Sequence, residues 1–595
     1  MISKNFLKAS AIMVSGALVL SACGQPAAEK TDDKTLPVIS ADNIKAHVTF
    51  LADDTMRGRD TGSLEYDIAA NYVASQYALL GLKPGGDGDS YFQNVDFAKS
   101  VIDPDSTTLM LTVDGKTTEL TMGEDFAISS NPGATVNLAS GDIVFVGHGL
   151  SAPELGHDDF ANIDVTGKII ARLQGAPEGA SDALKSTTQS KALHGAVGAI
   201  TLYTPERAVG LPFKVLSGYF TQESFNWVSR QDSEAKEVED INAFLSPAIG
   251  EKLLASAGLN FDQAIEAAAA SDFVGVPLSA SVVIKQVTKV SDSVSSSNIA
   301  GIIEGSDPLL KDEFVVISAH LDHVGTCPRR KHDTAEETDD ICNGALDNAS
   351  GIASMIEAAR AFVDSGQAPR RSLMFLALTA EEKGLLGADY FAKFPTVEKS
   401  KIVANVNLDM PVLLYDFADV VAFGGEHSTM GEITARATAR IGMSVAADPM
   451  PEENLFTRSD HYRFVQQGIP SIFLMSGPTE VGKPAGEGLK VFREFLKTNY
   501  HSPADDLGQP LNWDAAAKFS LVNYLIMNEV ANADVEPRWY EGNAFGDKFA
   551  PDATKAPTTN KVVPPVVEAP AEEAESEADA PAEEAKEETK EGEDG

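Results

Sequence analysis

Basic residues are scarce in this sequence. Its 595 residues include 47 Lys and Arg against 88 Asp and Glu, a formal net charge of −41 at pH 7. A surface with this excess of negative charge repels nucleic acid and anionic lipid, so we expect no nucleic-acid partner. Apolar residues make up 43% of the chain. The chain can therefore bury a large core, and its length fits two or three domains.

Two catalytic motifs are missing. No His-Glu-x-x-His sequence occurs, which excludes a thermolysin-like mechanism. No Gly-x-Ser-x-Gly elbow occurs to hold a nucleophilic serine. Ser459, Asp460 and His461 are consecutive in TRSDHYRF, whereas the members of a catalytic triad come from distant segments. The sequence therefore argues against a serine hydrolase.

The apolar stretch near the N-terminus is too short to span a membrane as a helix. Lys4 and Lys8 precede AIMVSGALVL, and LSACGQPAAEK follows, as in an export signal. The Leu-Ser-Ala-Cys ending resembles a bacterial lipobox, which implies a signal peptide over 1–22 and a lipid on Cys23. Gly24 after this cysteine favours attachment to the outer membrane of a Gram-negative cell, facing the periplasm or the cell surface. An ordinary secretory signal is the alternative.

The rest of the chain divides by composition into several parts. After Phe549 there is no aromatic residue, and Pro, Ala and Glu dominate, so we expect a disordered tail. Short β-like runs separated by Gly, Pro and Asp fill the region after residue 105. We expect a linker at 23–39, the first part of the main domain at 40–105, an insertion at 106–285, the main part at 286–545 and the tail at 546–595.

The inserted region carries a recognisable pattern. FANIDVTGKIIARLQGAPEG followed by SKALHGAVGAITLYT resembles a protease-associated (PA) domain. Such domains are insertions in peptidases that shape access to the active site. We therefore expect a β-rich PA-like domain at 106–285.

Two helices are predicted at the start of the main domain. Ser40 or Asp42 could cap a first helix, and Gly81 stops a second one. The second helix is predicted from residues that recur at helical spacing: Leu64, Ile68, Tyr72, Val73 and Tyr77. From Ser297 onward, apolar strands alternate with helices. This predicts a mixed, mostly parallel α/β sheet with helices on both faces.

Acids and imidazoles stand at the ends of these predicted strands and helices. They are His320, Asp322, Asp347, Glu381, Glu382, Asp409 and His501. Because the carboxyl ends of parallel strands line the ligand crevice, we expect these side chains to meet. Their N and O donors suit divalent metals, zinc foremost, and are numerous enough for two ions that share one carboxylate. Spacing alone does not say which of Glu381 and Glu382 binds metal and which is the base.

Five stretches in order resemble the motifs of the dizinc exopeptidases, the family of aminopeptidase Y, bacterial leucyl aminopeptidases and glutamate carboxypeptidase II. They are SAHLDHVG, NGALDNASGIASMIEAAR, TAEEKGLLGADYFA, NLDM and YHSPADDL. The resemblance covers roughly residues 40–105 and 290–530. It implies the zinc exopeptidase fold and two Zn²⁺ per chain.

The resemblance also implies residue roles. One zinc would bind His320, Asp347 and Asp409. The other would bind Asp347, Glu382 and His501, with Asp347 bridging the two. Glu381 would be the general base, Asp322 would orient His320, and His323 would not be a ligand. A stretch similar to TRSDHYRF often lines the site in this family, so Arg458, Asp460 and His461 are candidates for the substrate pocket.

The resulting interpretation is an exported zinc aminopeptidase that hydrolyses peptides. Three alternatives remain: a carboxypeptidase or dipeptidase, in which Arg458 would receive the substrate carboxylate; a glutaminyl cyclase; and a non-catalytic binding protein. Cys327 and Cys342 lie on one loop and are expected to form a disulfide, with metal binding by their thiolates as the alternative. The sequence gives no indication of the oligomeric state.

Overall fold

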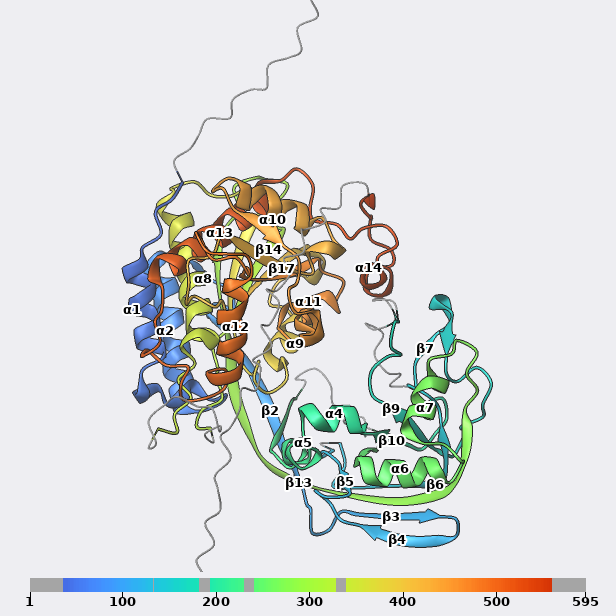
Figure 1. Ribbon diagram of the computed structural model, residues 1–595. Helices are drawn as coiled ribbons and strands as arrows, with labels where there is room; N and C mark the ends of the chain where they lie inside the picture. Colours follow the sequence, from blue (N-terminus) through green and yellow to red (C-terminus); the bar gives the residue numbers. More distant parts are fainter. Residues whose placement is uncertain are drawn as a thin grey trace, which may run out of the picture. The chain divides into compact units, whose positions relative to one another are not determined.

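A computed structural model describes residues 36–131, 133–180, 184, 193–228, 240–327 and 339–558 (Figure 1). The predicted signal peptide, Cys23 and most of the predicted tail lie outside the described residues. Within those that are described, no helix is both long and apolar enough to cross a membrane.

The main sheet is parallel at its centre. Strands β15, β14, β16 and β19 lie side by side in that order and run parallel. Antiparallel pairs flank them, β13 against β15 and β17 against β19. The strands are β1 (Lys83–Pro84), β2 (Phe92–Ile102), β11 (Ser224–Trp227), β13 (Val276–Ile303), β14 (Phe314–His320), β15 (Ser372–Leu378), β16 (Ile402–Leu408), β17 (Asp419–Phe423), β18 (Ser444–Ala446) and β19 (Ser471–Ser476). The predicted mixed α/β sheet is confirmed.

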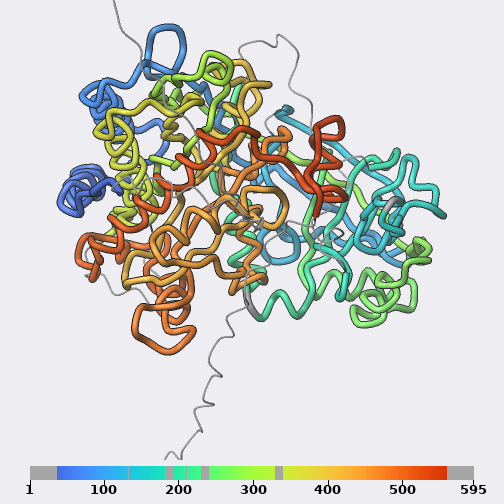
Figure 2. Tube along the Cα trace, turned by 90° about the horizontal axis from the view of Figure 1, so that it is seen from above, coloured from blue at the N-terminus to red at the C-terminus, as the bar shows by residue number. Residues whose placement is uncertain are grey.

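Helices cover the two faces of this sheet. On one side, α1 (Ala41–Leu51), α8 (Ser350–Asp364) and α13 (Trp513–Asn532) contact one another, and α2 (Leu64–Leu80) packs against α8 and β13. Figure 1 and Figure 2 show α1 and α2, in blue, beside the yellow-green α8. On the other side, Phe391 of α9 (Leu386–Lys393) and Phe464 of α11 (His461–Val465) pack with Val316 and Met374. Coverage of both faces explains why the central strands are continuous apolar runs.

Three further helices complete the main domain. They are α10 (Met430–Ala439), which contacts α13, α12 (Glu487–Thr498), which precedes His501, and α14 (Ala544–Phe549). Helix α14 crosses the predicted start of the tail at residue 546, and Ala556 still pairs with Tyr540 in a β-bridge. The structured part therefore extends further than predicted.

A second sheet forms in the predicted insertion. Its strands are β3 (Thr108–Val113), β4 (Lys116–Leu120), β5 (Phe126–Ala127), β6 (Val136–Phe145), β9 (Ile169–Leu173), β10 (Gly198–Leu202) and β12 (Asn242–Leu245). The long β13 pairs with β3 and β6 here and with β2 and β15 in the main sheet. The remaining elements are a pair of short strands, β7 (Ser151–Ala152) and β8 (His157–Asp158), and the helices α4 (Pro205–Gly210), α5 (Phe213–Phe220), α6 (Pro247–Ala255) and α7 (Phe261–Ala268). The predicted domain boundaries stay predictions.

Helix α1 begins and helix α2 ends where the sequence predicts. Ser40 caps α1 by accepting a hydrogen bond from the Asn43 amide, and Gly81 ends α2 at φ 74°. Leu64 is 71% exposed, however, whereas Tyr66 and Ala70 are buried. The helix that the spacing predicted is present, but Leu64 and Ile68 lie on its exposed side.

Candidate metal centre

His320 meets two carboxylates at the end of β14. Its Nε2 lies 3.1 Å from Oδ1 of Asp347 and 3.0 Å from Oδ1 of Asp409. Its Nδ1 lies 3.0 Å from the backbone carbonyl of Asp322, which can only accept, so Nδ1 carries a proton. Burial alone would lower the pKa of His320, but Asp409 and Glu381 raise it well above the usual value. His320, Asp347 and Asp409 thus form one buried group of three possible metal ligands.

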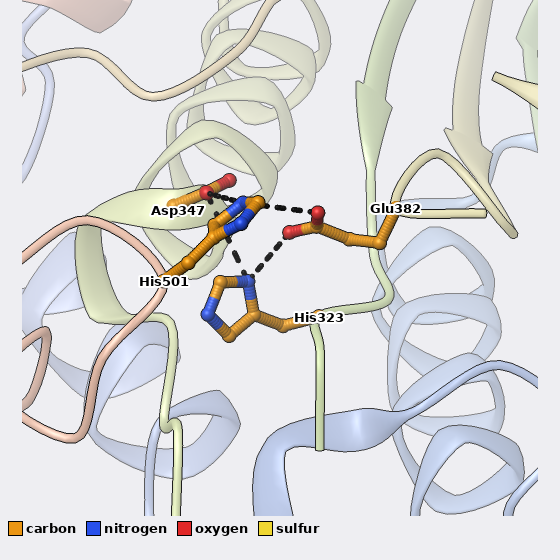
Figure 3. Close-up of side chains that lie close together, drawn as sticks. All are labelled: His323, Asp347, Glu382 and His501. Atoms are coloured by element: carbon orange, nitrogen blue, oxygen red, sulfur yellow. Dashed lines mark hydrogen bonds and ion pairs between the residues drawn. The ribbon is translucent and has the colours of Figure 1, made fainter. Parts of the chain in front are cut away.

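A second group lies on the other side of Asp347. Nε2 of His501 is 3.3 Å from Oδ2 of Asp347 and 3.0 Å from Oε2 of Glu382. Nδ1 of His323 is 2.8 Å from Oε1 of Glu382 and 3.9 Å from Oδ2 of Asp347. Figure 3 shows these four side chains pointing toward one another. Asp347 therefore faces both groups, one with each carboxylate oxygen.

In the second group, the imidazole and the carboxylates each favour the charged form of the other. Despite burial, His501 lowers the pKa of Glu382 to about 2. Glu382 and Asp347 in turn raise the pKa of His501 to about 10, against the effect of burial. Both carboxylates are therefore ionised and His501 is protonated at neutral pH.

The turn that carries Asp347 is anchored from two sides. Asp505 accepts hydrogen bonds from the amides of Leu346 (2.9 Å) and Asp347 (3.0 Å). The side chain of Asn348 donates to the carbonyl of Leu408, next to Asp409 (2.9 Å). These bonds fix the bridging position of Asp347 relative to the ends of neighbouring elements.

Asp322 supports the site in a different way from the one predicted. Its carboxylate accepts hydrogen bonds from Oγ1 of Thr61 (3.0 Å) and from the amides of Glu381 (3.2 Å) and Glu382 (3.3 Å). Only its backbone carbonyl contacts His320. The carboxylate of Asp322 therefore positions the Glu381–Glu382 turn rather than the imidazole, because two consecutive amides converge on it.

Glu381 faces a cavity of about 210 Å³. Burial, together with the charges of Glu382 and Asp409, raises the pKa of its carboxyl well above the usual value, although His320 opposes the shift. The other residues that line the cavity are Asp347, Asp409, Met410, Glu453, Leu455, Arg458, Ser459, Phe473, Leu496 and Tyr500. Glu381 thus lies close to His320 and Glu382 and opens onto this cavity, as Asp347 and Asp409 also do.

The donor set fits divalent metal ions. Two imidazole nitrogens and three carboxylates from five distant positions converge, and their atoms lie within 4.8 Å of one another in each group. Without cations, so many buried carboxylates would repel one another. Mixed nitrogen and oxygen donors of this kind suit zinc. The residues that could hold it are the predicted ones, with His323 as an additional neighbour.

Only part of the predicted substrate pocket lines the cavity. Arg458 does, and its Nη1 pairs with Glu453 at 3.2 Å. Asp460 and His461 are both 0% exposed and are not among the residues that line it, so their place in a substrate pocket stays a prediction. Burial raises the pKa of Asp460 well above its usual value and lowers the pKa of His461 to about 3. Ser459 contacts the site instead, donating to Oδ2 of Asp409 at 2.5 Å.

Cys327 and Cys342 form a disulfide, with their Cα atoms 5.9 Å apart. The Cys342 amide also donates to the carbonyl of Gly325 at 2.9 Å. The bond thus joins the segment after His323 to the segment before Asp347. The thiols are consumed in this bond and are not metal ligands.

Beyond the predicted residues, and besides Ser459 and Asn348, the site has contacts from Arg59, Thr61, His323 and Asp505. His323 and Asp505 occur within motif stretches noted in the sequence, HLDHVG and YHSPADDL. Thr61 and Arg59 come from TMRGRDTGS, a stretch with no metal-binding pattern of its own. Only their contacts in the fold reveal them.

Several proteins are similar to this chain in sequence. It is 26% identical over 288 residues to leupeptin-inactivating enzyme 1 of Streptomyces exfoliatus, covering 46% of this chain and 58% of the relative. It is 27% identical over 217 residues to aminopeptidase YwaD of Bacillus subtilis, covering 36% and 40%. The chain thus spans about half the length of these relatives.

Solved structures are similar over more of the chain. An aminopeptidase from Aneurinibacillus sp. strain AM-1 is matched with a TM-score of 0.46 and 18% identity, covering 83% of this chain and 94% of that one. The zinc aminopeptidase BSAP from Bacillus subtilis gives a TM-score of 0.38 at 18% identity, covering 84% and 97%.

The segment that contains the candidate metal centre also matches the model of a protein family. His320, Asp347, Glu382, Asp409 and His501 all lie within residues 298–527, the segment that matches Peptidase family M28.

Proposed function

We propose that this chain is an exopeptidase that uses two zinc ions and releases N-terminal residues from peptides. The match of residues 298–527 to a peptidase family supports the reaction class. The observation that carries the proposal is the position of Asp347, whose two oxygens face two separate sets of ligands. A shared carboxylate is how two ions are held about 3.5–4 Å apart in dinuclear hydrolases.

The pairing of Arg458 favours an aminopeptidase over a carboxypeptidase. Asp347, Glu381, Asp409 and Glu453 line the cavity, against the single cation Arg458. That cation is already paired with Glu453. Bound zinc would offset the charges of Asp347 and Asp409, so the feature that distinguishes the two activities is the pairing of Arg458. A substrate carboxylate meets no unpaired cation among the residues that line this cavity.

The same cavity supports a preference for apolar first residues. Its walls include Met410, Leu455, Phe473 and Leu496, and about 210 Å³ accommodates a single side chain. We expect leucine or methionine at the substrate N-terminus to be preferred over charged residues.

In the proposed mechanism, zinc, when bound, lowers the pKa of water and polarises the scissile carbonyl. Glu381 removes a proton from the attacking water and delivers it to the leaving amine. Its raised pKa suits a group that must hold this proton between the two steps. Asp322 keeps Glu381 and Glu382 in place through their amides.

The test compares aminoacyl anilides with N-acetylated peptides, each with and without a chelator. We expect hydrolysis of the free-amine substrates only, lost with the chelator and restored by zinc. Equal cleavage of the blocked peptides, or activity that survives removal of metal, contradicts the proposal.

The variant Arg458→Met separates the proposal from the carboxypeptidase alternative. An aminopeptidase should keep its KM and kcat within a few-fold, because Arg458 does not receive the substrate amine. Loss of activity on peptides with a free carboxylate would favour a carboxypeptidase or dipeptidase. Neither a glutaminyl cyclase nor a non-catalytic binding protein has a specific observation in its favour, since no predicted metal ligand is missing.

We also propose that the protein is exported and tethered by a lipid on Cys23, and that the insertion is a PA-like domain. The lipobox-like sequence supports the first proposal. A cavity of about 900 Å³ supports a role for the insertion in substrate access, because Tyr219, Phe220 and Phe225 line it together with Glu382 and His501. Fatty-acid labelling that persists in Cys23→Ser would contradict the anchor.

A further inference from the structure

Arg59 is an arginine buried completely within the main domain, at 0% exposure. Its guanidinium donates four hydrogen bonds, all to backbone carbonyl oxygens: Nε to Leu321 (3.0 Å), Nη1 to Leu51 (2.5 Å) and Asn343 (2.6 Å), and Nη2 to Gly344 (3.1 Å). Such a planar group with fixed donors holds its acceptors at set distances.

Three of these carbonyls belong to the two segments that carry His320 and Asp347, and the fourth, that of Leu51, is at the end of α1. Leu321 stands between His320 and Asp322 at the end of β14. Gly344 immediately precedes the turn Ala345–Ala349, which contains Asp347. Arg59 therefore joins the segment that holds one imidazole to the segment that holds the shared carboxylate.

The backbone around Arg59 is shaped to fit between these segments. Arg57, Gly58 and Arg59 all have positive φ, at 43°, 70° and 49°. Such a run is unfavourable for residues with a side chain and persists only where the surroundings impose it. Here the Gly325 amide donates to the Gly58 carbonyl at 3.2 Å. A Cβ on Gly58 would lie only 2.4 Å from the carbonyl oxygens of Gly325 and Cys342.

Arg59 also brings positive charge to the carboxylates of the centre. Burial lowers its pKa to about 10, while the charges of Asp505, Asp322, Asp347 and Glu382 oppose that shift. The guanidinium therefore stays protonated at neutral pH. Its charge offsets part of the repulsion among these carboxylates.

We propose that Arg59 is a positioning residue of the metal centre, which fixes the spacing between the end of β14 with His320 and the turn with Asp347. This inference rests on the proposed zinc-dependent function. The guanidinium of Arg59 donates to backbone carbonyls rather than to the side chain of a proposed ligand, and Arg59 is not among the residues that line the cavity beside Glu381. Its effect should appear in zinc affinity rather than in KM.

The experiment compares Arg59→Met and Arg59→Lys with the wild type in the full-length protein. Arg57→Met is the matched control, because Arg57 shares the same turn but its side chain is 62% exposed. Zinc affinity is measured by competition with a chromophoric chelator, and thermal unfolding shows which variants fold. We expect Arg59→Met to bind zinc about 10- to 100-fold more weakly, as for other residues that orient metal ligands. Lysine keeps the charge but cannot reach all four carbonyls, so its affinity should be intermediate. Arg57→Met should match the wild type.

Kinetics at limiting and at saturating zinc add a second readout. In Arg59→Met, kcat should fall at limiting zinc and recover with excess zinc, while KM stays unchanged. A folded Arg59→Met variant with wild-type zinc affinity overturns the inference.

If Arg59→Met does not fold, Arg59→Lys is measured in its place. If neither variant folds without metal, recovery of the fold by excess zinc supports the inference, and no recovery at any zinc concentration overturns it. Absence of zinc from the wild type itself would instead refute the proposed function.

Discussion

At the scale of single residues, Asp347 connects the two halves of the metal centre. One oxygen faces His320 and the other faces His501. His320 and His501 together lower its pKa well below the usual value despite complete burial. An ionised carboxylate with both oxygens directed at separate imidazoles is suited to bridge two cations.

Glu381 gives the first prediction at this scale. Glu381→Gln keeps the shape of the side chain but cannot take up a proton. We expect kcat to fall about 100- to 10,000-fold, the usual contribution of a general base. Zinc content and thermal stability should stay at wild-type values, since Glu381 belongs to neither set of proposed ligands.

Glu119→Gln, an exposed glutamate on β4, serves as the control for this substitution. Its kinetics should equal those of the wild type. Turnover by Glu381→Gln at the wild-type rate would show that another group moves the proton.

The imidazoles give a second prediction, which concerns pH. In the metal-free protein, His320 and His501 are protonated at neutral pH, the latter with a pKa of about 10. Zinc binds only neutral imidazole, so binding at pH 7 should release about two protons. Because protons are released, zinc affinity should rise with pH up to about 10. Calorimetry in buffers of different ionisation enthalpy measures the release, and a value near zero would contradict these assignments.

At the scale of elements, the backbone around the site is held in unusual conformations. Ala380, before Glu381, has φ 55°, Met410, after Asp409, has φ 41°, and His501 itself has φ 52°. Strain of this kind gathers where surrounding structure forces side chains into a functional arrangement. The backbone at the ends of these strands and helices thus directs the proposed ligand side chains toward one another.

The disulfide allows a prediction for the loop that it closes. Cys327 and Cys342 are 15 residues apart, and closing a loop of that length stabilises a protein by about 3 kcal/mol. The double variant Cys327→Ser, Cys342→Ser should lose about that much stability. Urea unfolding measures the loss. Reductant should destabilise the wild type similarly and leave the double variant unchanged. A wild type that reductant does not affect would show that the bond contributes nothing.

Strand positions could be predicted from sequence because a buried parallel strand is a continuous apolar run that ends abruptly in polar residues. This pattern placed His320, Glu382 and Asp409 together. The spacing of large apolar residues predicted helix α2 but does not mark its buried face, because small residues such as Ala70 face inward while Leu64 faces outward. The direction in which individual side chains point could not be predicted from the sequence either. TRSDHYRF did not reveal that Asp460 is buried beneath the site, nor did HLDHVG reveal that His323 contacts Glu382.

At the scale of the whole molecule, the candidate metal centre is built from segments that are far apart in the chain. Residues 59–61 precede the insertion, yet they contact the ends of strands more than 250 positions later. The N-terminal part of the main domain therefore contacts the segments of the candidate metal centre, although it carries no proposed ligand.

The acidic C-terminal sequence allows a prediction at this scale. Residues 559–595 are rich in Pro, Ala and Glu and contain no aromatic residue. A segment of this composition has too little apolar surface to pack on the enzyme, so deleting it should change kcat/KM by less than about twofold. A large loss of activity after this truncation would assign the tail a role in catalysis.

Zinc-edge anomalous diffraction from crystals of the metal-bound protein tests the central claim most directly. Two peaks are predicted about 3.5–4 Å apart, one on each side of the Asp347 carboxylate. One would be bound by His320 and Asp409, the other by Glu382 and His501. No peak at this position, or zinc bound only elsewhere on the chain, would contradict the account.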